Sequence, residues 1–75
     1  MKDINDIELK QYDVIDIGQT VNGQSEFFIE SLDPLDIRYN YDRSRKYEYN
    51  KDDLLKPCRF TGESEFTILS RGSLN

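Results

Sequence analysis

The chain has 75 residues, with fifteen acidic side chains against ten basic ones, a formal net charge of -5, one Cys and no His or Trp. This length supports a single domain with one small core. One Cys cannot form an intrachain disulfide, and without His it cannot form a zinc site or a Cys–His catalytic pair. The longest apolar run, Phe27-Phe28-Ile29, is too short to cross a membrane. The first residues lack the apolar stretch of a signal peptide, so we expect a cytoplasmic protein.

The composition favours strands over helices. The chain has no Ala, the best helix former, and it is rich in Ile, Tyr and Phe. Turn signals recur at short intervals, at Gly18, Asn22-Gly23, Asp33-Pro34, 42–45 and Thr61-Gly62. We therefore predict one all-β domain over residues 1–75, with its core between residues 7 and 70 and a frayed tail at 71–75.

The chain begins with a predicted arm and strand. Residues 3–11 form an irregular arm that places Ile7 and Leu9 on the core. A first strand over 12–17 carries apolar residues on both faces, which indicates burial on both sides or a bulge near Gly18.

A β-hairpin follows. Asn22-Gly23 predicts a type I′ turn, because that turn needs positive φ at both central residues. A second strand covers 25–32 and ends at Asp33-Pro34, because proline cannot donate a hydrogen bond to the neighbouring strand.

The next segment has the clearest alternating pattern. Ile37, Tyr39 and Tyr41 alternate with polar residues, and Tyr47 and Tyr49 do so again after a loop over 42–45. If Tyr41 lies opposite Tyr47, then Tyr39 lies opposite Tyr49. Both tyrosine pairs then share one face of an antiparallel hairpin.

The last third predicts a helical turn and two short strands. Asn50 caps a single turn over 51–55, which Pro57 ends. Strands then follow over 59–61 and 65–70.

These short strands, with a long first connection and a helical turn before the last strands, resemble the Src-homology-three-like (SH3-like) small β-barrel. The opening Leu9-Lys10-Gln11-Tyr12-Asp13-Val14-Ile15 is similar to the Leu-Lys-x-Gly-Asp-x-Val start common in such barrels, with Tyr12 where Gly is usual. The resemblance covers residues 7–70 and implies a small five-stranded barrel with one short helical turn. This superfold carries peptide readers, nucleic-acid readers and structural parts, so it implies no single function. The peptide groove of its signalling members contains a Trp, which this chain lacks, and this argues against a proline-rich ligand.

The tyrosine hairpin is also basic. Residues 38–51 carry a local charge of +3, whereas residues 1–37 carry -7. Cations beside aromatic rings are what a platform for single-stranded nucleic acid needs. The alternative is that the tyrosines cover the core while the charges keep the hairpin tip soluble. The net negative charge also disfavours nucleic acid as a partner.

The acidic first half indicates a second alternative. Its carboxylates could line one face, imitate a phosphate backbone and engage a basic partner such as a nuclease. Ordinary solvation of strand faces explains them equally. The nine residues are Asp3, Asp6, Glu8, Asp13, Asp16, Glu26, Glu30, Asp33 and Asp36.

No other motif predicts catalysis, a metal or a cofactor. The pairs Asp13/Asp16 and Asp52/Asp53 lack the spacing of a calcium loop, and the glycines are scattered. Cys58 has apolar neighbours and is interpreted as a small core residue. We therefore expect a protein that is not an enzyme and that needs no cofactor.

Adjacent Phe27 and Phe28 point to opposite faces of a strand, so one core cannot take both unless the strand is covered on both sides. This predicts a protein contact or a homodimer, unless the arm covers the second face. The chain is then a protein-interaction module or accessory subunit, which its composition places in a bacterium or phage. The candidate binding residues are Phe27, Phe28, Arg38, Tyr39, Tyr41, Arg43, Arg45, Lys46, Tyr47 and Tyr49.

Overall fold

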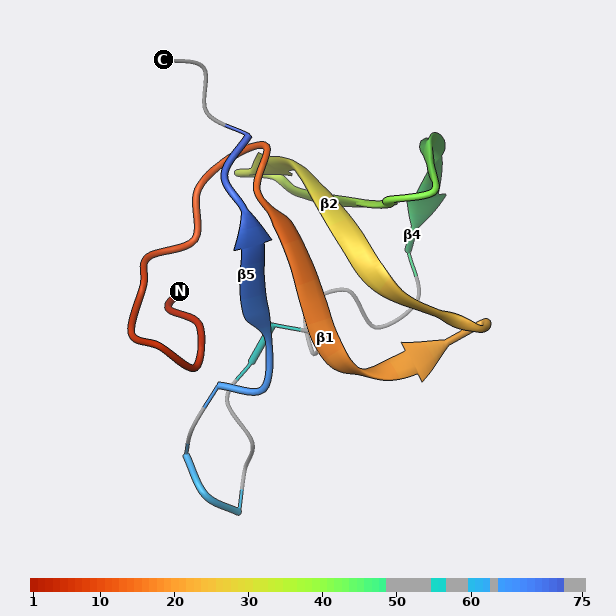
Figure 1. The fold of residues 1–75 in the computed structure, drawn as a ribbon. Helices are drawn as coiled ribbons and strands as arrows, with labels where there is room; N and C mark the ends of the chain where they lie inside the picture. The colour runs from red at the N-terminus through yellow and green to blue at the C-terminus, as the bar shows by residue number, and fades with distance from the viewer. Residues whose placement is uncertain (49–54, 57–59, 63, 73–75) are drawn as a thin grey trace.

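The computed structural model describes residues 1–48, 55–56, 60–62 and 64–72. Its five strands form one antiparallel sheet that curls into a half-barrel (Figure 1). The strand order is β4-β3-β2-β1-β5, so the last strand returns to pair with the first. The all-β prediction is confirmed. The strands are β1 (Val14–Val21), β2 (Gln24–Leu32), β3 (Leu35–Tyr39), β4 (Asp42–Tyr47) and β5 (Thr67–Ser70).

The β1–β2 hairpin has the predicted turn. Asn22 and Gly23 have φ values of 53° and 77°, and the flanking residues Val21 and Gln24 pair. A type I′ turn matches the right-handed twist of the two strands it joins, which explains why Asn-Gly is so strong a signal. The predicted boundary of the second strand is correct to one residue.

The predicted irregularity near Gly18 is also present. The register between β1 and β2 shifts between Asp16 and Val21, and Gly18 has a φ of 77°. A Cβ on Gly18 would lie 2.8 Å from the carbonyl oxygen of Glu65, so glycine is required here by conformation and by space. β1 continues past this bulge to Val21, four residues beyond the predicted strand end.

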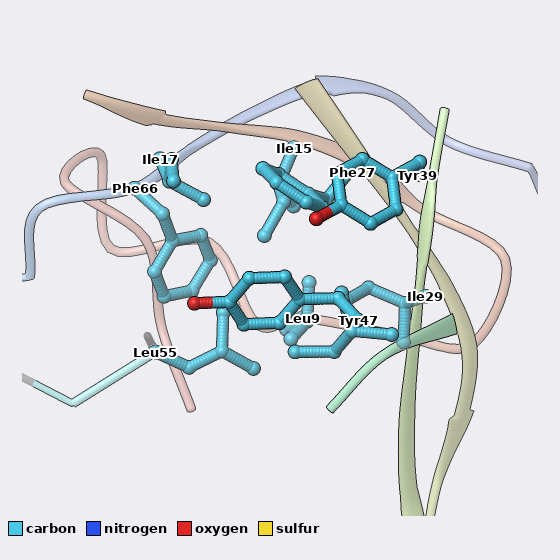
Figure 2. Packing of buried hydrophobic residues seen from close by; sticks show 10 residues of the cluster. Leu9, Ile15, Ile17, Phe27, Ile29, Tyr39, Tyr47, Leu55 and Phe66 are labelled. Atoms are coloured by element: carbon cyan, nitrogen blue, oxygen red, sulfur yellow. The ribbon is translucent and has the colours of Figure 1, made fainter. Parts of the chain in front are cut away.

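The core lies on one side of the sheet, which we call the inner face (Figure 2). Phe27 is at its centre, with its ring 5.1 Å from the Tyr39 ring and 5.3 Å from the Tyr47 ring. The opposite side, the outer face, carries Phe28. The buried cluster consists of Leu9, Ile15, Ile17, Phe27, Ile29, Ile37, Tyr39, Tyr47, Leu55 and Phe66.

The arm before β1 folds onto the edge of β5 (Figure 1). One carboxylate oxygen of Asp3 accepts hydrogen bonds from the backbone N–H groups of Asn5 and Ile7, and the other accepts one from Ile68 of β5. Leu9 is buried as predicted, but Ile7 is 42% exposed, so its predicted place on the core is wrong. The arm is held by hydrogen bonds to a buried carboxylate and not by an apolar stripe.

A tight turn leads from the arm into β1. The Asp13 N–H donates to the carbonyl of Lys10 at 3.2 Å, and Tyr12 has a φ of 73°. A residue in this left-handed conformation is usually glycine, because other side chains are strained there. The Arg71 Nε–H donates to the Asp13 carboxylate at 3.1 Å and ties this turn to the end of β5.

The predicted β3–β4 hairpin exists, but its register is wrong. Tyr39 pairs with Asp42, so the turn is Asn40-Tyr41 and not 42–45. Ile37, and not Tyr41, lies opposite Tyr47. The helical turn over 51–55 falls mostly outside the described residues, as does Cys58. Residues 60 and 61 form a turn, so the short strand predicted over 59–61 is wrong at these two positions.

Candidate interaction surface

Three extra residues bulge out of β4. Arg38 pairs with Lys46 and its neighbour Tyr39 pairs with Asp42, so Arg43–Arg45 have no partners in β3. We call Arg43–Lys46 the basic bulge. Because β4 is at one end of the strand order, this bulge lies along an edge of the sheet (Figure 1).

Arg43 turns back onto the outer face. Its guanidinium carbon lies 4.1 Å from the centre of the Phe28 ring, and its Nη2–H donates to Asn40 Oδ1 at 2.8 Å. Tyr12 stacks with Phe28 at a centroid distance of 6.1 Å. A guanidinium on an aromatic face gains both cation–π attraction and a fixed orientation.

Arg45 turns onto the inner face. Its guanidinium carbon lies 4.6 Å from the centre of the Tyr39 ring, and its Nη1–H donates to the Tyr41 hydroxyl. The Tyr39 hydroxyl accepts a hydrogen bond of 2.8 Å from Asn22, which joins the β1–β2 turn to the β3–β4 hairpin. Residues two apart in a regular strand share a face, so it is the bulge that sends Arg43 and Arg45 to opposite faces.

Lys46 lies opposite Arg38, on the outer face. The Arg38 guanidinium donates hydrogen bonds of 2.8 and 3.0 Å to the carboxylate of Asp36. These bonds raise the pKa of Arg38. Arg38 also donates to the carbonyl of Arg43 at 3.0 Å, which fixes the base of the bulge. Arg38 is thus a support for the bulge more than a free charge.

The bulge carries three cations, Arg43, Arg45 and Lys46. Among the described residues, none forms an ion pair with Arg43, Arg45 or Lys46, although Lys2, Arg38 and Arg71 each have one. Asp42, which precedes the bulge, accepts hydrogen bonds from the Ser44 hydroxyl at 2.6 Å and the Ser44 N–H at 3.2 Å, and these bonds, together with the charge of Arg45, lower the pKa of Asp42. The tip of the hairpin therefore keeps its positive charge in an acidic protein.

A shallow hollow of about 300 Å³ adjoins the bulge, between the β1–β2 turn and the β3–β4 turn. Tyr41 forms one wall and is 57% exposed. The other wall residues are Gly23, Gln24, Ser25, Glu26 and Asn40.

Only part of the predicted aromatic platform is on the surface. Tyr39 and Tyr47 are 3% and 5% exposed and belong to the core, as the alternative interpretation expected. Tyr41 alone presents a ring beside the cations, and Tyr49 lies outside the described residues. A row of stacked bases cannot rest on rings that are buried.

A protein contact through this pair of rings would require Phe27 or Phe28 to be exposed, and neither ring is. Phe27 is fully buried on the inner face, and Phe28 is 8% exposed on the outer face. The second face is covered by Tyr12, at the end of the arm, and by Arg43. These contacts remove the reason to expect an exposed aromatic patch at this place.

The nine early acidic residues do not share one face. Asp3 and Asp13 are buried and accept hydrogen bonds within the fold, and Asp36 is paired with Arg38. Asp16 and Glu26 lie directly opposite each other on β1 and β2 and so share the outer face, but the buried Asp3 and Asp13 cannot join them there. This scatter does not imitate a phosphate backbone.

The described residues contain neither a cluster of metal ligands nor a helix that could span a membrane. No group of three or more Cys, Asp and Glu side chains is gathered there as metal ligands. No helix there has the length and apolarity to span a membrane.

Comparison with known protein families, curated proteins and solved structures finds no match to this chain.

The basic bulge is only partly predictable from the sequence. The cations of 43–46 were recognised from composition, but nothing in the sequence indicated the three-residue bulge that orients them.

Proposed function

We propose that this chain is a non-enzymatic protein-interaction module, or a small accessory subunit, of the SH3-like barrel type, and that it binds through the basic bulge. The strand order, in which β5 returns to β1, supports the SH3-like assignment. So does the turn before β1, where Tyr12 adopts the positive φ for which such barrels use glycine.

One observation carries the proposed binding surface: Arg43, Arg45 and Lys46 have no ion pair to any described residue, in a chain with a net charge of -5. Charged residues on an edge strand also prevent aggregation, which is the alternative role for these cations. The ring contacts of Arg43 and Arg45 favour binding, because oriented guanidinium groups lose less freedom when they meet an anion. Each guanidinium has more N–H donors than the hydrogen bonds it makes with described residues.

Nucleic acid is a weaker candidate for the same surface. A long polyanion would extend beyond the bulge onto Glu26, Asp36 and Glu48. Among the described residues, Tyr41 is the one exposed ring that it would find beside the bulge. A short acidic protein segment needs only the cations that the bulge provides.

The test is a titration of the ¹⁵N-labelled protein with a capped oligoglutamate at about 10 mM salt, where the Debye length is about 30 Å. We expect amide shifts confined to residues 41–47, weakened by Lys46→Gln. The matched control is Lys10→Gln, which removes the same charge from an exposed lysine of the arm without an ion pair to a described residue. Absence of shifts, or equal loss in both variants, would refute binding at the bulge.

A further inference from the structure

The cations of the basic bulge are divided between the two faces of the sheet, and this division determines which anion can reach them together. Arg43 and Lys46 lie on the outer face, and Arg45 lies on the inner face. A ligand confined to one face reaches only part of the charge. A ligand that meets all three cations must pass along the edge of β4.

An extended peptide has the required geometry. Its successive side chains point to opposite sides, so adjacent residues of a peptide running along a sheet edge project over the two faces. Adjacent carboxylates would therefore meet Arg43 and Arg45 at the same time. Carboxylates separated by one residue would all project to the same face.

The edge of β4 that faces away from β3 carries no strand among the described residues. Among the described residues, β4 pairs with β3 alone, whereas the opposite edge of the sheet, at β5, is occupied by Asp3 and Ile4 of the arm. In Figure 1, β4 lies at one edge of the sheet, and the arm lies beside β5 at the other edge.

We infer that the partner is an extended acidic protein segment with adjacent carboxylates, which straddles the β4 edge and places neighbouring side chains on Arg43 and Arg45. This inference rests on the proposed function and adds the spacing of the carboxylates in the sequence of the partner.

Two capped peptides test the inference. They have the same length, composition and charge, but one carries its glutamates in an unbroken block and the other alternates glutamate with serine. From the strength of one additional exposed ion pair, we expect the block peptide to bind about twofold to fivefold more tightly to the full chain at low salt. Affinities are measured by the amide shifts of residues 41–47.

Arg45→Gln should abolish the preference for the block peptide, because it removes the cation of the inner face. Lys10→Gln should preserve the preference. The dispersion of the amide spectrum and a thermal unfolding curve show whether each variant is folded, and Arg45→Lys, which keeps the charge, should retain a preference.

The outcomes separate the two proposals. If neither peptide shifts the bulge amides, the proposed function fails. If both bind equally, the bulge binds acidic segments but the straddling geometry is wrong. If oligothymidylate of equal charge binds more tightly than either peptide, the partner is nucleic acid and the inference is overturned.

Discussion

The carboxylate of Asp3 accepts a hydrogen bond of 2.9 Å from the backbone N–H of Ile68, and so takes the place that a neighbouring strand's carbonyl would have beside β5. The same carboxylate accepts the N–H groups of Asn5 and Ile7, and Asp3 is 4% exposed. Burial by itself raises the pKa of Asp3, but the three N–H donors and the charge of Arg71 outweigh it, so this pKa lies below its ordinary value of 3.8.

Asp3→Asn should destabilise the fold by about 1–3 kcal/mol, because the amide NH₂ would face backbone donors that are buried with it. Urea denaturation at pH 7 measures the change. Asp6→Asn, at a side chain that is 83% exposed in the same arm, is the control and should change stability by less than about 0.5 kcal/mol. Equal effects of the two variants would contradict the role assigned to Asp3.

The stability contributed by Asp3 should depend on pH in a defined direction. Because the folded state lowers the pKa of Asp3, the ionised form favours folding, and its contribution is complete above the ordinary value of 3.8. It declines as the pH falls through 3.8 and is lost below the pKa of the folded state. The difference in unfolding free energy between the wild type and Asp3→Asn should therefore be largest at pH 7 and shrink toward pH 2. A difference independent of pH would contradict this.

Phe28→Asp should unfold or strongly destabilise the protein, by about 3 kcal/mol or more, because it places a carboxylate where a ring is enclosed by Tyr12 and Arg43. Tyr41→Asp makes a comparable change at an exposed ring and should leave stability within about 1 kcal/mol of the wild type. Thermal unfolding followed by circular dichroism compares the two. A stable Phe28→Asp variant would restore this ring as a candidate contact surface.

At Tyr12, glycine should be better tolerated than alanine, the reverse of their usual order. Both variants lose the stack on Phe28, but only alanine keeps the strain of a left-handed residue, about 1–2 kcal/mol. Urea denaturation of Tyr12→Gly and Tyr12→Ala measures the difference. An equal or lower stability of the glycine variant would argue against strain at this turn.

The parts of the fold that were predicted correctly depend on local chemistry. Asn22-Gly23 specifies its own turn, and Pro34 ends β2 because it has no N–H to donate. The prediction that Phe27 and Phe28 point to opposite faces is correct for the same reason, since it follows from the geometry of a single strand.

The parts that were wrong depend on how two distant segments meet. Asp42 to Arg45 has the polar composition of a turn, but Asn40-Tyr41 turns instead and lets Ile37 reach Tyr47 inside the core. Burial of two large side chains outweighed the local preference for a turn. The role of Asp3 was missed because its partner Ile68 is 65 residues away.

The candidate surface combines both kinds of information. The positive charge of residues 43–46 follows from the sequence, but its separation onto two faces depends on rings contributed by Phe28 of β2 and Tyr39 of β3. Pattern analysis of β4 alone cannot show which face a bulged side chain takes.

The arm folded against β5 also limits the stoichiometry of any complex. Growth of a filament by strand addition requires each subunit to offer a donor end and an acceptor end. Here the chain's own first residues cap one of these ends, through Asp3 and Ile68. A segment that docks on the remaining edge, at β4, therefore terminates the assembly. We expect complexes with a single bound segment and no polymer.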